Sequence, residues 1–269
     1  MGRVCAALVA LVLLTIGVPG YSWANFEEGK SAYERRNYPL AVRILLPLAK
    51  EGDADAQSLL GFMFLGGKGV EKDTKEGMKW MRLAAEKGHA VSQHTLGVFL
   101  GERTKGVFDA EESEKWIRRA AEQGYAIAQY DLASRLDEGD GMQKNSDEAL
   151  KWLQRAADQG MPRAQNNLGT NYLKGQQVSQ DFKKAAKWYR LAAIQGHATS
   201  LYNLAITYAA GQGNELNFVE SYKWLSIFEK RGGKVLERVK KRFLNIKTKV
   251  AERLTPEDIA KAQKLSGLS

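Results

Sequence analysis

The stretch DFKKAAKWYRLAAIQGHA, residues 181–198, contains the pattern from which most of the chain is built. Its tryptophan, Trp188, and its glycine, Gly196, recur at a fixed interval of 36 residues. The residue seven positions before each tryptophan is always Asp or Asn. Several independent columns that share one period identify a repeat protein. The two most regular columns are Trp80, Trp116, Trp152, Trp188 and Trp224, and Gly88, Gly124, Gly160, Gly196 and Gly232.

Each repeat is predicted to contain two helices. In the first full repeat, apolar and small residues follow Gln57 at helical offsets and form one stripe of a helix over residues 54–65. Gly61 is matched by Gly or Ala in every repeat, so we expect another helix to approach closely there. Asp73 begins the second helix in a capping-box-like sequence with a Glu three residues later. Gly88 ends it, as a left-handed C-terminal glycine does.

The expected fold class is all-α, a right-handed superhelical solenoid of helix-pair repeats with about 14 helices and no strands. The chain divides into a signal peptide (1–24), a degenerate N-terminal helix pair (25–52), five repeats (53–232) and basic C-terminal capping helices (233–269). A repeat array needs such an end piece, with a polar outer side. Thr255 is expected to cap the short last helix. The long helix before it has one apolar face: Leu236, Val239, Phe243, Ile246, Val250 and Leu254.

The consensus A-x-A-Q-x-x-L-G-x-x-Y, followed by G-x-G-V-x-x-D and A-x-x-W-x-x-x-A-A-x-x-G, resembles the Sel-one-like repeat, a relative of the tetratricopeptide repeat. The resemblance covers residues 37–232 and implies adaptor, assembly or signalling roles, including periplasmic regulators that bind sensor proteins. Two departures stand out. We expect a Gly-x-Gly turn between the two helices of every repeat except the second, which has GERTKGV instead. The fifth repeat has Leu201 in the column that begins with Gln57.

The first 24 residues have the features of an export signal. Arg3 precedes an apolar run from Val4 to Val18, and Ser22-Trp23-Ala24 suits cleavage before Asn25. A membrane anchor is the competing interpretation, but the run is short for a span and Pro19-Gly20 interrupts it. We expect an exported protein, periplasmic or secreted. Its mature part lacks cysteine, so neither disulfides nor thiol chemistry are available to it.

The positive charge is concentrated at the C-terminal end. Residues 25–229 carry 27 basic and 27 acidic side chains, whereas residues 230–269 carry 12 basic and 4 acidic ones. Export argues against a nucleic-acid partner. Membrane association is not expected either, because the apolar stripe of this helix is needed to cover the last repeat. A solvated face or an acidic protein partner remains for the basic segment.

No constellation in the sequence predicts catalysis, a metal or another cofactor. His89 follows a C-terminal glycine in a column that also holds Asp, Tyr and Met, which indicates a loop position. His94 has no further ligands in reach, and His197 lies three repeats away. Ser92 lies on a different helix face from His94, so the two do not make a nucleophile and base. The tryptophan column is interpreted as core between repeats rather than a stacking surface.

The positions at which the repeats differ predict a binding face. In tetratricopeptide-like arrays the first helices line the concave groove, where a segment of a partner protein docks. Amide side chains there can donate to and accept from a bound backbone. The alternative is that the adjacent pair Asn166-Asn167 has a structural role. The candidate residues are His94, Thr95, Tyr130, Asp131, Arg135, Asn166, Asn167, Asn171, Tyr202 and Asn203.

The sequence therefore predicts an exported scaffold, not an enzyme, that binds a protein or peptide through this face as an adaptor or regulator in the cell envelope. Two alternatives stay open. One is a cell-wall-directed hydrolase of the β-lactamase or amidase type, although the cysteine framework of related β-lactam-binding proteins is missing. The other is a structural envelope component that binds peptidoglycan or membrane through the basic end.

Overall fold

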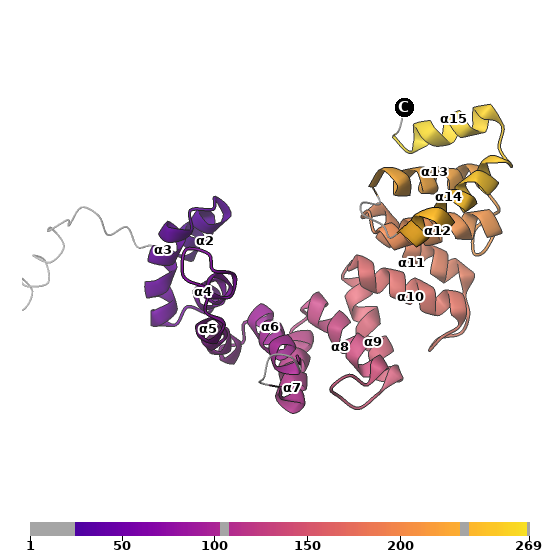
Figure 1. Ribbon diagram of the computed structural model, residues 1–269. Helices are drawn as coiled ribbons and strands as arrows, with labels where there is room; N and C mark the ends of the chain where they lie inside the picture. Colours follow the sequence, from indigo (N-terminus) through magenta and orange to yellow (C-terminus); the bar gives the residue numbers. More distant parts are fainter. Residues whose placement is uncertain (1–24, 103–107, 232–236, 268–269) are drawn as a thin grey trace, which may run out of the picture. The chain divides into compact units, whose positions relative to one another are not determined.

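The structure is a computed structural model that describes residues 25–102, 108–231 and 237–267, without the side chains of 231–242. These residues form 14 α-helices and no strand, as predicted, and Figure 1 shows how helices consecutive in sequence pair. The helices are α2 (Phe26–Glu34), α3 (Tyr38–Glu51), α4 (Ala54–Gly66), α5 (Thr74–Glu86), α6 (Ala90–Gly101), α7 (Ala110–Glu122), α8 (Ala126–Glu138), α9 (Ser146–Asp158), α10 (Pro162–Lys174), α11 (Phe182–Ile194), α12 (Ala198–Ala210), α13 (Phe218–Arg231), α14 (Glu237–Ala251) and α15 (Pro256–Leu265).

The described residues fall into two compact units, divided between Gln93 and His94. Helices α2 to α5 belong to the first unit and α7 to α15 to the second, while the division runs through α6. Leu45, Leu60 and Trp80 belong to the core of the first unit. The second unit contains two buried clusters, one around α7 to α10 and one around α11 to α15.

The second helices begin as predicted, at an Asp or Asn whose side chain accepts a hydrogen bond from the backbone three residues later. In the second repeat Asp109 accepts from the amide of Glu112 at 2.9 Å, and Asn145 accepts from Glu148 at 3.1 Å. The glutamate carboxylates of this sequence have a further use, because Trp116 donates its indole N–H to Glu112 at 3.1 Å. Trp152 and Trp224 make the same bond to Glu148 and Glu220. The cap residue and the core tryptophan are thereby joined through one glutamate.

Small residues on the first helices allow the two helices of a repeat to touch. A Cβ atom placed on Gly97 would lie 2.6 Å from Ile117, and one on Gly169 would lie 2.9 Å from the Tyr189 ring. Because α6 and α7 lie this close, the Ser113 hydroxyl can donate to the carbonyl of Gly97 at 2.7 Å. The prediction of a close helix contact at this column is confirmed.

The tryptophan column packs between repeats, as predicted. Trp80, Trp116, Trp152 and Trp224 are buried, and Trp188 is half-buried against the cluster of the preceding repeats. Arg155 lies with its guanidinium carbon 4.4 Å from the centre of the Trp152 ring, which covers the outer side of the indole.

A buried glutamine joins each of the first four repeats to the helix before it. The side chains of Gln129 and Gln165, on α8 and α10, donate to the carbonyls of Ala121 and Ala157 at 3.0 and 3.2 Å. Gln57 and Gln93 make the same bond, each to a carbonyl eight residues earlier. In the fifth repeat Leu201 takes the place of the glutamine and is fully buried.

The fourth repeat corrects our expectation for the loops between the two helices. We expected Gly-x-Gly in every repeat but the second; the fourth has Gly175-Gln176-Gln177 instead. Gln177 nevertheless keeps the backbone of the missing glycine, with φ of 60°. A residue other than glycine rarely adopts this conformation. The GERTKGV loop of the second repeat lies largely outside the described residues.

The C-terminal helices cover the end of the second unit. Phe243 and Val250 of α14 are buried in the last cluster, and Ile246 and Leu254 pack against it. The side chains of Leu236 and Val239, predicted for the same face, lie outside the described residues. Thr255 caps α15 in a complete capping box with Asp258, as predicted.

The glutamine contact gives a first testable prediction. Gln129→Ala removes two hydrogen bonds, the one that Gln129 donates to the Ala121 carbonyl and the one that it accepts from Gln159, while Ala121 keeps its bond from the Gly124 amide. Each such bond contributes about 0.5–1.5 kcal/mol, so we expect the free energy of unfolding to fall by about 1–3 kcal/mol. Urea unfolding followed by circular dichroism measures the change. The control is Gln143→Ala, an exposed glutamine before α9, which should stay within about 0.5 kcal/mol of the unmodified protein. Equal stability of the two variants would contradict the role of the buried amide.

Candidate protein-binding face

Four of the predicted residues form a hydrogen-bonded chain across three repeats of the second unit. Asn167 on α10 donates to the hydroxyl of Tyr130 on α8 at 3.1 Å. Its neighbour Asn166 donates to Asn167 at 3.4 Å and accepts from Asn203 on α12 at 3.2 Å. The structure thus brings Tyr130, Asn166, Asn167 and Asn203 together, as we expected of residues on one face of the first helices.

The two adjacent asparagines differ in accessibility. Asn166 is 9% exposed and its side-chain oxygen also accepts from Ser200 at 2.9 Å. Asn167 is exposed. Asn166 therefore fits the structural alternative considered above, because its amide is used up in joining α10 to α12. Asn167 can offer its side chain to a partner.

His94, Asp131 and Arg135 form a second group on the first helices. Asp131 Oδ2 lies 3.4 Å from His94 Nε2 and 3.3 Å from Arg135 Nε. Burial raises the pKa of Asp131, but His94 and Arg135 outweigh it, and the pKa lies below its ordinary value. His94 also packs edge-on against Tyr125, with ring centres 5.6 Å apart. The polar groups of His94, Asp131 and Arg135 are therefore mainly occupied by contacts with one another.

The remaining candidates lie in different surroundings. Thr95 is half-buried on α6. Tyr202 is half-buried and its ring packs against Phe228 on α13, 6.3 Å between centres, so it belongs to the edge of a core cluster. Asn171 lies one turn after Asn167 and borders a cavity between α8 and α10.

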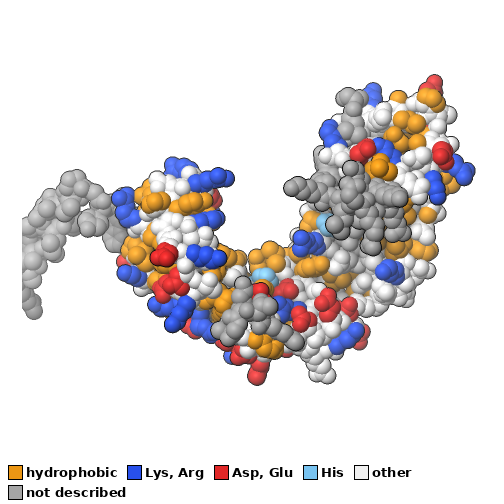
Figure 2. All heavy atoms as spheres, viewed as in Figure 1, with side chains coloured by type: hydrophobic (Ala, Val, Ile, Leu, Met, Phe, Trp, Pro, Cys, Tyr) orange, Lys and Arg blue, Asp and Glu red, His pale blue; other side chains and the backbone are white. Residues whose placement is uncertain are grey.

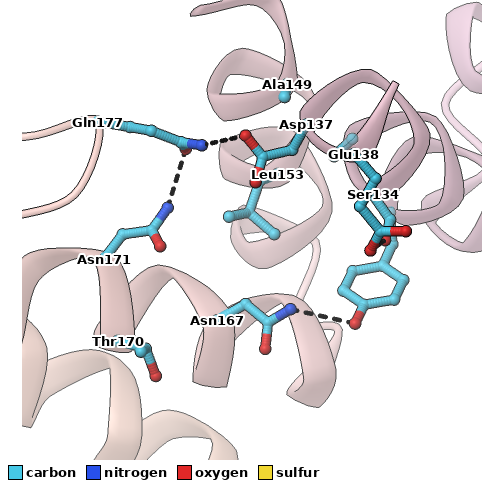
Figure 3. A pocket seen from close by; sticks show the side chains of 11 residues that line it. Ser134, Asp137, Glu138, Ala149, Leu153, Asn167, Thr170, Asn171 and Gln177 are labelled. Carbon is cyan, nitrogen blue, oxygen red and sulfur yellow. Dashed lines mark hydrogen bonds between the residues drawn. The ribbon is translucent and has the colours of Figure 1, made fainter. Parts of the chain in front are cut away.

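The cavity has a volume of about 190 Å³ and lies between the third and fourth repeats (Figure 3). Three predicted residues line it: Tyr130, Asn167 and Asn171. The other polar residues of the lining were not predicted from the sequence, although a helical spacing from Tyr130 indicates those on α8. They are Ser134, Asp137, Glu138, Thr170 and Gln177. We call these eight residues, together with Asn203, the first-helix face.

Hydrogen bonds hold the polar edge of the cavity in place, as the dashed lines of Figure 3 show. Gln177 donates to Asp137 Oδ1 at 2.6 Å and accepts from Asn171 at 3.1 Å. Ser134 donates to Glu138 at 3.2 Å. The unusual backbone of Gln177 turns its side chain across to α8 of the preceding repeat. The loop of one repeat thereby fixes a carboxylate of another.

One arrangement in the first unit resembles a catalytic triad in its residue types. His89 Nδ1 lies 3.0 Å from Ser92 Oγ, and Nε2 lies 3.3 Å from Asp55. Ser92 is 0% exposed, so a substrate cannot reach its hydroxyl. His89 Nδ1 also accepts from the backbone amide of Ser92 at 3.2 Å, which is helix capping rather than base catalysis. Among the described residues, no three His, Cys, Asp or Glu side chains are arranged to hold a metal.

The Sel1 repeat family matches residues 54–89, 90–125, 126–161, 162–197 and 198–232, more than half of the chain. The chain belongs to the Sel1 repeat family. Its five Sel1 repeats agree with the period and the resemblance found in the sequence. A comparison with curated protein sequences gave no match.

Solved structures of Sel1 repeat proteins are similar to this chain. A Sel1 repeat protein from Oxalobacter formigenes is 32% identical, with a TM-score of 0.69, over 78% of this chain and 83% of the other. A protective antigen present in uropathogenic Escherichia coli strains is 26% identical, with a TM-score of 0.55. That match covers 89% of this chain but only 59% of the antigen. A Pseudomonas aeruginosa protein at 20% identity and a TM-score of 0.50, covering 76% and 81%, shares the fold.

Sel1 repeats generally form scaffolds for protein–protein interaction and are typically not enzymes.

On the side drawn in Figure 2, hydrophobic side chains reach the surface in separate small patches, with charges of both signs between them. In the part of the chain that the structure describes, no helix is both long and apolar enough to span a bilayer. The predicted signal peptide, residues 1–24, lies outside that part.

His197, the last residue of the fourth Sel1 repeat, gives a testable pH dependence. It precedes α12, and its Nδ1 lies 2.9 Å from Ser200 Oγ. Burial, and then the positive charge of Arg163, lowers the pKa of His197 below its usual 6.5. The folded state therefore favours the neutral imidazole. The free energy of unfolding falls as the pH drops from above 6.5 toward the lower pKa of the folded state.

His197→Asn keeps a side chain suited to helix capping and removes the titration. We expect the free energy of unfolding to fall less for this variant than for the unmodified protein between about pH 7.5 and about pH 5.5. Urea unfolding at the two pH values measures the difference. An equal or larger fall in His197→Asn would show that His197 does not oppose protonation.

Proposed function

We propose that this chain is an exported Sel1 repeat scaffold that binds a segment of another protein on the first-helix face. In this proposal it acts as an adaptor or regulator in the cell envelope. The observation that carries the proposal is the cavity between α8 and α10, because three residues singled out by their variability line it. It lies on helices whose other sides are already committed to packing.

The chemistry of this face suits an extended protein segment. Asn167 is exposed, and Asn171 and Tyr130 are half-buried, so a ligand can reach them. An amide offers both a donor and an acceptor, which is what the backbone of a peptide requires. The hydrogen-bonded chain from Tyr130 to Asn203 holds these groups in fixed positions, which lowers the entropy lost on binding.

The export and the adaptor role rest on sequence features. The apolar run and the cleavage sequence of residues 1–24 support transfer out of the cytoplasm. The excess of basic over acidic residues in 230–269 suits an acidic partner or solvent. A scaffold function needs no cofactor, and none is part of the proposal.

Site-specific photocross-linking in intact cells tests the binding face. A photoreactive amino acid at Asn167 should yield a discrete cross-linked protein. The same group at Lys187, an exposed residue on α11 of the same repeat, should not. Asn171→Ala should weaken the cross-link from position 167 without changing the helical signal of the purified protein. Cross-links of equal yield from both positions, or from Lys187 alone, would contradict the proposal.

Mass spectrometry of the protein recovered from the envelope fraction tests export. The expected N-terminus is Asn25, because cleavage follows Ala24. Replacement of Ala24 by a bulky residue, as in Ala24→Phe, should leave the longer precursor. A chain that keeps residues 1–24 and stays in the cytoplasm would rule out the export part of the proposal.

A further inference from the structure

We infer that the cavity between α8 and α10 receives an arginine side chain of the partner segment. This inference rests on the proposed function and deepens it, because it names the chemistry that the first-helix face recognises. It is carried by the charge of the cavity, by its unused hydrogen-bond acceptors and by its shape.

The charge of the cavity is opposite to that of the chain. Asp137 and Glu138 line it, and no Lys, Arg or His is among its lining residues. The full chain has a formal net charge of +9, yet residues 108–150 contain 11 Asp and Glu against five Lys and Arg. A cavity with carboxylates in such a segment concentrates a negative potential and attracts a cation.

The polar atoms that remain available in the cavity are mainly acceptors. Asp137 Oδ1 accepts from Gln177 and from Ser146, whereas Oδ2 has no partner within the described residues. Glu138 Oε2 and Asn171 Oδ1 are likewise without donors in that part of the chain. Three acceptors from two helices require a ligand group with several N–H donors. A guanidinium has five of them in one plane.

The shape of the cavity favours arginine over a small cation. Leu153 and Ala149 of α9 and Ala133 of α8 provide apolar surface, which suits the methylene groups of a long side chain. Tyr130 borders the same space with its ring, and a guanidinium stacks on an aromatic face more readily than an ammonium does. Figure 3 shows Leu153 beneath the polar edge that Asp137 and Gln177 form.

The contact from Gln177 prepares the site for this ligand. Its amide holds Asp137 Oδ1, and Asn171 is held through the same side chain. The two free acceptors on these residues thus have fixed positions before a ligand arrives. A fixed acceptor pair discriminates a planar fork of donors from a single ammonium.

Titration of the full chain with three short peptides tests the inference. The probes are acetyl-Gly-Gly-Arg-Gly-Gly-amide and its counterparts with lysine or citrulline in place of arginine. Citrulline has nearly the shape of arginine but no charge. Since one side chain supplies most of the contact, we expect the arginine peptide to bind weakly, with Kd of about 1 mM. NMR shifts of the amides in α8 and α10 report on the location. The lysine peptide should bind less tightly, and the citrulline peptide should not bind measurably.

Two variants and one control locate the effect. Asp137→Asn keeps the oxygen that accepts from Gln177 and Ser146 but removes the charge. Glu138→Gln likewise removes the charge and keeps an oxygen that can accept from Ser134. Together they should weaken binding of the arginine peptide by at least about tenfold. Glu122→Gln, an exposed residue at the end of α7 outside the cavity, removes a charge as well and should leave binding unchanged. Unchanged helicity and melting show that the variants fold.

Three results would overturn the inference: equal binding of the citrulline peptide, equal weakening by Glu122→Gln, or equal binding of the lysine peptide, which would contradict the guanidinium assignment. The cross-link from Asn167 separates this failure from that of the proposed function. If the cross-link persists while the arginine peptide fails to bind, only the arginine assignment is wrong. If the cross-link is absent as well, both are wrong.

Discussion

In four of the five repeats a buried glutamine donates a hydrogen bond to the end of the preceding helix and sets how the two helices pack. In the second unit, Gln129 and Gln165 bond to the carbonyls of Ala121 and Ala157. Each of these carbonyls also accepts from the backbone amide of the glycine that follows its helix, Gly124 or Gly160. The glutamine of the next repeat donates a second hydrogen bond to the same oxygen, which satisfies the remaining acceptor capacity of a buried helix end. In the first four repeats the first helix is thereby tied to the helix before it.

The packing of the glutamine side determines which side of each first helix remains exposed. The glutamine and the leucine three residues later lie in the core, and the small residue beside them touches the second helix of the same repeat. Asn167 lies on the opposite side of α10 and is exposed, although Asn166 next to it is buried. Packing constrains the first side and leaves the second free to vary. A binding face can therefore change its residues without a change in the fold.

The repeat period carried most of the fold information. Helix ends, the Asp and Asn caps, the glycines with positive φ and the buried tryptophans were all predictable, because each depends on contacts that recur every 36 residues. The candidate face was predictable only in outline. Tyr130, Asn167 and Asn171 do line the cavity, but His94 is turned to Asp131 and Tyr202 to Phe228. A helical stripe shows which side a residue occupies, not how far the neighbouring repeat covers it.

The parts of the site that the sequence did not reveal depend on departures from the period. Gln177 stands where the first, third and fifth repeats have glycine, and its side chain reaches Asp137 forty residues earlier in the chain. Nothing in the local sequence gives that distance. The carboxylates of Asp137 and Glu138 look like ordinary exposed charges near the end of a helix. Only the fold brings them to a cavity with the amides of the next repeat.

Hydrogen–deuterium exchange of the full chain, alone and with the protein captured by cross-linking from Asn167, tests whether the first-helix face binds the partner. If a partner segment docks there, we expect slower exchange in residues 126–138 and 162–177, which include α8, α10 and the loop that contains Gln177. Slower exchange confined to the second helices α7, α9 and α11, or to α14 and α15, would contradict docking on that face.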